Sequence, residues 1–106
     1  MNTLTVYAWG KETCLNTRID NYRNNGNLYI GLIDNDGLPY ADLTVNIETL
    51  PDDHAAVDTN NCPWVEQVLF DTGIGIPTGK YRASGFCNYP IYFIFTANLK
   101  KYRCEI

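Results

Sequence analysis

LYIGLIDNDGLPYADLTVNIE, residues 28–48, contains two strands and the turn that joins them. Leu28, Ile30 and Leu32 occupy alternate positions, which is the spacing of one strand face. The turn is Asp34-Asn35-Asp36-Gly37, because these residue types tolerate positive φ and form short Asx hydrogen bonds. From Tyr40 to Glu48 apolar and polar residues alternate. That alternation predicts a second strand with one buried face and one polar face.

The same kinds of pattern continue on both sides of this hairpin. They predict strands at 4–9, 12–22 and 89–96, a turn at 24–27, loops at 49–60 and 73–88, and one helix near 62–72. Asn60-Asn61 and Pro63 would begin the helix, and Gly73 would end it. The last strand is apolar on both faces and should be central in its sheet. We therefore expect one domain, residues 1–106, of the α+β class: a mostly antiparallel sheet of about five strands with one helix packed on it.

Composition excludes several broad classes of protein. The chain has 106 residues, of which 45% are hydrophobic, so it can form a core and is not intrinsically disordered. No apolar run approaches the length of a membrane span. The first residues show no charged segment followed by an apolar one, as a secretory signal would. We expect a cytoplasmic protein with no membrane partner.

Charge is distributed very unevenly along the chain. Residues 24–79 contain nine acids and no Lys or Arg, whereas the flanks contain all eight bases and three acids. The central part therefore carries −9 and the flanks +5. Acids can form a docking surface or can simply keep a face solvated, and both alternatives stay open here. The acids that we predict to bind a partner are Asp34, Asp36, Asp42, Glu48, Asp52, Asp53, Asp58 and Asp71.

No motif of enzyme chemistry is complete. Ser84 has no nucleophile-elbow glycines around it, and the single histidine, His54, lies in a polar loop. The GIPTGK segment, residues 75–80, is one residue too short for a phosphate loop, and Tyr81 follows it where Ser or Thr is needed. The turn at 34–37 lacks the ligands of a calcium loop. We expect no catalytic residue, no cofactor and no metal.

The four cysteines leave a minor alternative open. Cys14, Cys62, Cys87 and Cys104 contain no C-x-x-C pair, so a zinc site is disfavoured. Cys62 and Cys87, together with His54, could bind a metal or form a thiol site. Cys62 precedes the predicted helix, and a helix N-terminus favours the thiolate. Buried, unreactive thiols are the competing interpretation.

Direct binding of nucleic acid is also disfavoured. Aromatic residues such as Tyr7, Trp9 and Tyr29 could stack on bases. A nucleic-acid groove needs a continuous basic track, however, and the middle of this chain is acidic. The aromatic residues are better interpreted as sheet packing or as anchors of a protein interface.

Several blocks of sequence resemble a known family. They are Leu28–Asp34, Gly37–Asn46, Asn60–Trp64, Thr78–Lys80 and Ser84–Pro90. Through them the chain, from about Asn21 to Tyr92, resembles a family of small uncharacterised domains carried by phages and conjugative elements. The resemblance implies no reaction and no catalytic residue. It implies a genetic context, the accessory genes of mobile elements, among which inhibitors of host defence are frequent.

Charge and context together yield the functional hypotheses. The first is an anti-defence protein, an anti-CRISPR that inhibits a nucleic-acid-guided nuclease by presenting carboxylates where phosphates would lie. Its partner would be a host defence protein, a CRISPR effector nuclease. The second is a non-enzymatic accessory or interaction module of a mobile element, whose acidic face is only solubilising. The third, an enzyme using Cys62 or Cys87, is disfavoured.

Overall fold

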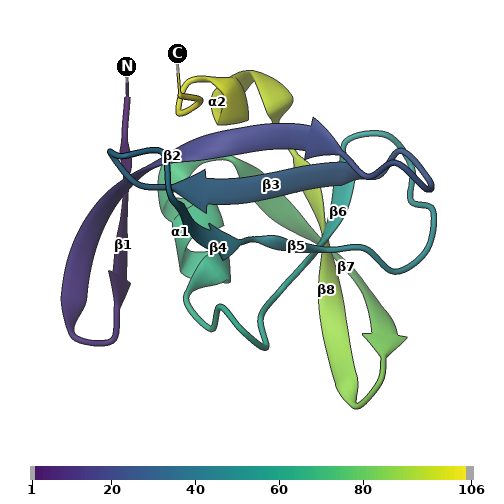
Figure 1. The fold of residues 1–106 in the computed structure, drawn as a ribbon. Coiled ribbons are helices and arrows are strands. Elements are labelled where there is room, and N and C mark those ends of the chain that lie inside the picture. The colour runs from purple at the N-terminus through teal and green to yellow at the C-terminus, as the bar shows by residue number, and fades with distance from the viewer. Residues whose placement is uncertain (1, 105–106) are drawn as a thin grey trace.

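The chain forms two antiparallel sheets and two short helices, seen in a computed structural model that describes residues 2–104 (Figure 1). The elements in order are β1 (Leu4–Ala8), β2 (Lys11–Asn21), β3 (Leu28–Ile33), β4 (Pro39–Asp42), β5 (Thr44–Val45), β6 (His54–Val57), α1 (Val65–Thr72), β7 (Gly75–Ser84), β8 (Cys87–Ile94) and α2 (Thr96–Lys100). One sheet has the order β1-β2-β3-β4, and the other has the order β5-β6-β8-β7.

The α+β class and the mostly antiparallel pairing are confirmed, but the predicted architecture is wrong in detail. The described residues contain two four-stranded sheets and two helices, not one sheet of about five strands with a single helix. The strand expected at the end of the chain is β8, and it is central in its sheet, as its apolar faces indicated. The elements that sequence patterns missed are β6, β7 and α2.

Three hairpin turns connect the strands of the first sheet. Those at 24–27 and 34–37 follow the predicted chemistry, whereas Trp9 was expected to lie in a strand. Trp9 and Gly10 join β1 to β2 with φ of 50° and 72°, the left-handed conformation of a two-residue type I′ turn. Gly26 has φ of 75° in the turn before β3. At the β3–β4 turn, the Asp34 carboxylate accepts hydrogen bonds from the backbone N–H groups of Asp36 and Leu38, both at 2.9 Å.

The strand predicted from Tyr40 to Glu48 is divided at Leu43. β4 pairs with β3 in the first sheet, whereas β5 pairs with β6 in the second. Leu43 is fully buried between them, donates its N–H to Ile30 and accepts a hydrogen bond from the N–H of Asp58. Alternation of apolar residues continues through the division, so it cannot reveal that the strand changes partner.

The sequences of the missed elements lack the usual patterns of strands and helices. β7 contains Pro77 and Gly79, but it is an edge strand with a register shift between Pro77 and Tyr81, and both residues are tolerated there. β6 is only His-Ala-Ala-Val and is almost fully buried, so it has no alternation. α2 has five residues, too few to show a helical period.

Helix α1 packs on the main core. Its buried residues Val65, Val68 and Leu69 join one hydrophobic cluster with residues of both sheets. The helix ends at Gly73 with φ of 68°, as predicted, but it begins at Val65, after Trp64, without a side-chain cap. Asn60 and Asn61 do not cap it, because the preceding segment turns around Asp58, whose carboxylate accepts from the N–H of Asn61 at 3.1 Å. No helix within residues 2–104 is both long and apolar enough to cross a membrane.

Candidate partner-binding cleft

A polar cleft of about 340 Å³ lies between the β2–β3 turn and the loop that leads from β5 to β6. Its lining includes Asn21, Asn25, Asn27, Asp52, Asp53 and His54. Amide and carboxylate side chains therefore converge on one hollow from two segments that are distant in sequence. Polar groups placed in a concave site can fix the orientation and the identity of what binds there.

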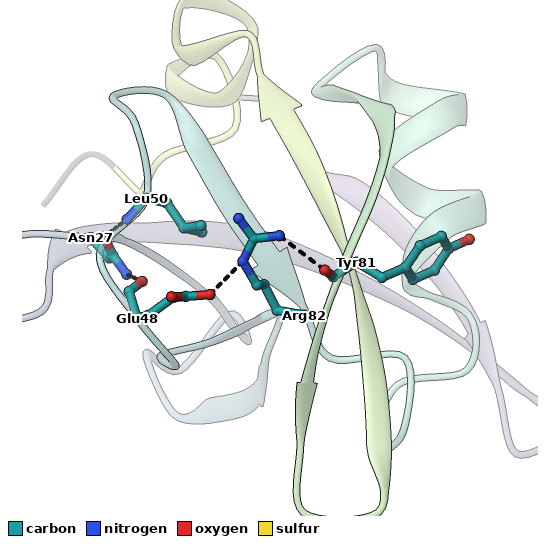
Figure 2. Close-up of polar contacts among 5 residues, drawn as sticks. All are labelled: Asn27, Glu48, Leu50, Tyr81 and Arg82. Atoms are coloured by element: carbon teal, nitrogen blue, oxygen red, sulfur yellow. Dashed lines mark hydrogen bonds and ion pairs between the residues drawn. The ribbon is translucent and has the colours of Figure 1, made fainter.

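Asn27 holds the loop side of the cleft in place (Figure 2). Its Nδ2 donates to the backbone carbonyl of Glu48 at 2.7 Å, and its Oδ1 accepts from the backbone N–H of Leu50 at 3.0 Å. Only 7% of Asn27 is exposed, so these hydrogen bonds are partly shielded from water. The amide thus acts like a short strand partner for a loop that has none of its own.

Further asparagines extend this support on the other side of the cleft. Asn46 Oδ1 accepts hydrogen bonds from the Nδ2 atoms of Asn25 and Asn27, each at 3.0 Å. Asn46 Nδ2 in turn donates to Asn24 Oδ1 at 2.8 Å. The turn and the β5–β6 loop are therefore linked by a continuous amide network.

Asp52 and Asp53 occupy the rim of the cleft at its loop side. The ring Nδ1 of His54 lies 2.8 Å from the Asp52 carbonyl, and the N–H of Ile94 donates to the Asp53 carbonyl at 2.7 Å. Asp53 has φ of 60°, a conformation that Asp and Asn tolerate better than most residues. The backbone is thus well anchored, while both carboxylates form no hydrogen bond or ion pair within residues 2–104 and are exposed.

The acids of the β3–β4 turn lie at the other end of β3. Asn27 precedes this strand and Asp34 follows it, and its six residues span about 20 Å at a rise of roughly 3.3 Å per residue. Asp34 is committed to the turn, whereas the Asp36 carboxylate has no hydrogen-bond partner within the described residues. The structure therefore separates Asp34 and Asp36 from Asp52 and Asp53.

Asp42 and Asp58 come together around the Cys62 thiol. Cys62 donates to the Asp42 carbonyl at 3.6 Å, and burial together with these two carboxylates raises the pKa of its thiol to about 11. Asp42 also accepts the Tyr29 hydroxyl at 2.6 Å. Burial above all, then the hydrogen bond and charge of Asp42, raises the pKa of Tyr29 to about 12.

The last two predicted acids, Glu48 and Asp71, each contact another side chain of this protein. Glu48 forms an ion pair with Arg82 of β7, the only ion pair in the part of the chain that the structure describes (Figure 2). Asp71, in the last turn of α1, accepts from Gln67 Nε2 at 2.8 Å. Neither residue joins the cleft or the β3–β4 turn.

Cys62 does not have the properties of a reactive thiol. A thiol with a raised pKa is protonated near neutral pH and is a poor nucleophile, and Cys62 is only 3% exposed. Cys87 packs against a separate hydrophobic cluster. Among the described residues, no group of three or more His, Cys, Asp or Glu side chains could hold a metal ion.

Sequence reasoning missed the residues that build the cleft. Asn27 looked like part of an ordinary turn, and Asn46 like a polar strand position. Their pairing depends on a fold that brings residues about twenty positions apart into contact. The one available signal was the density of asparagines at 24–27, which exceeds what a turn requires.

Comparison with known proteins gives one result. No curated protein and no solved structure matches the chain significantly. A family model described as a domain of unknown function, DUF4313, matches residues 14–105, and this confirms the resemblance to an uncharacterised domain. The chain therefore belongs to the DUF4313 family.

Proposed function

We propose that this protein is an anti-defence protein of a mobile element, an anti-CRISPR that binds a nucleic-acid-guided nuclease. Acidic side chains would take the places that nucleic-acid phosphates occupy in the nuclease. One observation supports this most: Asp52 and Asp53 present free carboxylates at the rim of a polar cleft, on backbone that is hydrogen-bonded in place.

The chemistry of the cleft favours a basic partner. Free carboxylates beside amide groups can accept charge-assisted hydrogen bonds from Lys or Arg side chains. No Lys or Arg occurs between residues 24 and 79 to compete for them. A guided nuclease carries a positively charged channel for its nucleic acid. Attraction between the two surfaces would speed association and make it sensitive to salt.

The predicted acids contribute unequally in this proposal. Asp52, Asp53 and Asp36 have carboxylates free to meet a partner. Asp34 and Asp58 accept backbone hydrogen bonds of their own turns, so they also stabilise the fold. Their local role is the observation that favours the alternative function, an accessory module whose acids have no partner.

The test measures binding of DNA by guided nucleases of several effector types, with and without equimolar protein. We expect DNA binding to fall with the wild-type protein. The double variant Asp52→Asn/Asp53→Asn should inhibit much less, and Asn is tolerated at the positive φ of Asp53. The matched control is Glu12→Gln/Asp20→Asn, which removes the same amount of charge outside the acidic segment.

The outcomes separate the two functions. If the wild-type protein leaves DNA binding and cleavage unchanged for every effector type, the anti-CRISPR proposal is wrong. If both double variants weaken inhibition equally, inhibition depends on the net charge of the protein and not on the cleft. The assignment of Asp52 and Asp53 is then wrong. A plasmid-maintenance assay tests the second function. An effect on maintenance that both double variants retain would favour the accessory function.

A further inference from the structure

We propose that β1 is a pairing edge, and that its partner is β1 of a second copy of this chain in antiparallel orientation. The proposal does not depend on the acidic cleft. It rests on the contrast between β1 and the other edge strands, on the direction of its backbone groups, and on the self-complementarity of its side chains.

The other three sheet edges are protected against pairing with another chain. β4 begins with Pro39 and lies beside a register shift, and β5 has only two residues. β7 carries Pro77, Lys80 and Arg82 and is interrupted by a register shift. Proline, charge, shortness and irregular register are the usual means by which proteins block an exposed edge.

β1 has none of these protections. Its sequence, Leu-Thr-Val-Tyr-Ala, contains no proline and no charged residue. Its five residues pair with β2 in continuous register from Leu4–Leu15 to Ala8–Lys11. Within residues 2–104, no strand pairs with its other side. β1 is therefore a regular, neutral template for one more strand.

The register shows which backbone groups are available. A two-residue turn makes its flanking residues, Ala8 and Lys11, a hydrogen-bonded pair, and such pairs alternate along the ladder. Leu4, Val6 and Ala8 therefore bond to β2. The N–H and C=O groups of Thr5 and Tyr7 point away from β2, at the open side of the strand.

A two-fold axis at Val6 satisfies all of these groups. Thr5 of one copy then faces Tyr7 of the other, and the two residues exchange both backbone hydrogen bonds, twice across the axis. Tyr opposite Thr is a favourable aromatic and β-branched pair. No like charges meet in this arrangement, although each copy carries a net charge of −4. Two first sheets would join into one continuous eight-stranded sheet.

The test uses charge swaps at the two outward positions, measured by sedimentation equilibrium over a wide concentration range. Tyr7 is 70% exposed and Thr5 is half-buried, and neither side chain belongs to the buried core. We expect the wild-type protein to approach twice the 12.0 kDa chain mass as its concentration rises. Thr5→Lys/Tyr7→Lys and Thr5→Glu/Tyr7→Glu should each raise the dissociation constant at least about tenfold, because like charges then face each other. An equimolar mixture of the two variants should restore the dimer as a heterodimer.

A control variant and a second measurement guard against misfolding. Tyr81→Lys places one positive charge on the protected edge β7, half of what Thr5→Lys/Tyr7→Lys adds to β1, and should leave the association unchanged. Amide hydrogen exchange on the wild-type chain should show protection of Thr5 and Tyr7 that grows with concentration. A single 12.0 kDa species at all concentrations would overturn the proposal, and so would a dimer that the Thr5 and Tyr7 variants leave intact.

Discussion

The side chain of Tyr29 lies over Gly31, and a Cβ at Gly31 would collide with the phenol hydroxyl. Gly31 pairs with Arg18 on one side and with Asp42 on the other, so all three residues lie on one face of the first sheet. The missing side chain at Gly31 lets Tyr29 reach the Asp42 carboxylate across the strand.

Gly31→Ala should destabilise the protein by about 0.5–1.5 kcal/mol, because the new methyl group displaces the Tyr29 phenol and breaks its hydrogen bond to Asp42. Urea unfolding of the single variants and of the double variant Tyr29→Ala/Gly31→Ala gives the measurement. In the Tyr29→Ala background the phenol is gone, so the same glycine substitution should cost clearly less. An equal cost in both backgrounds would contradict the contact.

The Tyr29 phenol should ionise at a higher pH than an ordinary tyrosine, because burial and Asp42 raise its pKa to about 12. A raised pKa means that the fold favours the neutral phenol. The stability that Tyr29 contributes is therefore complete below pH 10 and is lost as pH rises through about 12. Tyrosinate absorbance, compared between the wild type and Tyr29→Phe, isolates this group. Asp42→Asn should lower its pKa, and an unchanged titration would contradict the role of Asp42.

Asn27→Ala should destabilise the protein by about 1 kcal/mol, because it removes two hydrogen bonds to partly buried backbone groups of the β5–β6 loop. Hydrogen exchange should also become faster at the Leu50 N–H, which donates to Asn27 Oδ1. Asn24→Ala is the matched control, since Asn24 is exposed and contacts only Asn46 in this network. An equal loss of stability in both variants would argue against the special role of Asn27.

Cys62 should resist alkylation in the folded protein, whereas Cys14 should react readily. Cys62 is buried and its thiol pKa is raised to about 11, while Cys14 is exposed. Mass spectrometry after treatment with iodoacetamide near neutral pH gives the order of modification. Denaturant should abolish the difference. Rapid modification of native Cys62 would show that its thiol is more accessible and more ionised than the structure implies.

The Glu48–Arg82 ion pair should add little to stability, since its side chains are 58% and 40% exposed. A double-mutant cycle with Glu48→Gln and Arg82→Gln should give a coupling energy of about 0.2–1 kcal/mol that falls as salt is added. A coupling well above this range, or one insensitive to salt, would mean that the pair is more shielded from water than its exposure indicates.

The fold could be predicted from sequence where local chemistry decides the structure. The Asp34–Gly37 turn, the Gly73 helix end and the central position of β8 were all predicted, because residue type alone sets backbone preference or burial there. The division at Leu43 and the strand β7 depend on which segment becomes a neighbour. Pairing over long sequence distances leaves no local signature.

The candidate site was predictable only in part, for the same reason. Charge patterning identified Asp52 and Asp53, since the absence of nearby bases is visible in the sequence. It could not show that Glu48 meets Arg82 or that Asp34 and Asp53 lie at different ends of β3. Asn27 carries no charge, and its role follows only from where the loop after β5 passes.

Leu43 connects the two sheets directly, because β4 ends at Asp42 and β5 begins at Thr44. This one residue joins them: its N–H donates to the carbonyl of Ile30, and its C=O accepts from the N–H of Asp58. A load applied across the first sheet therefore reaches the second through backbone hydrogen bonds and a single covalent link, with no slack linker to absorb extension.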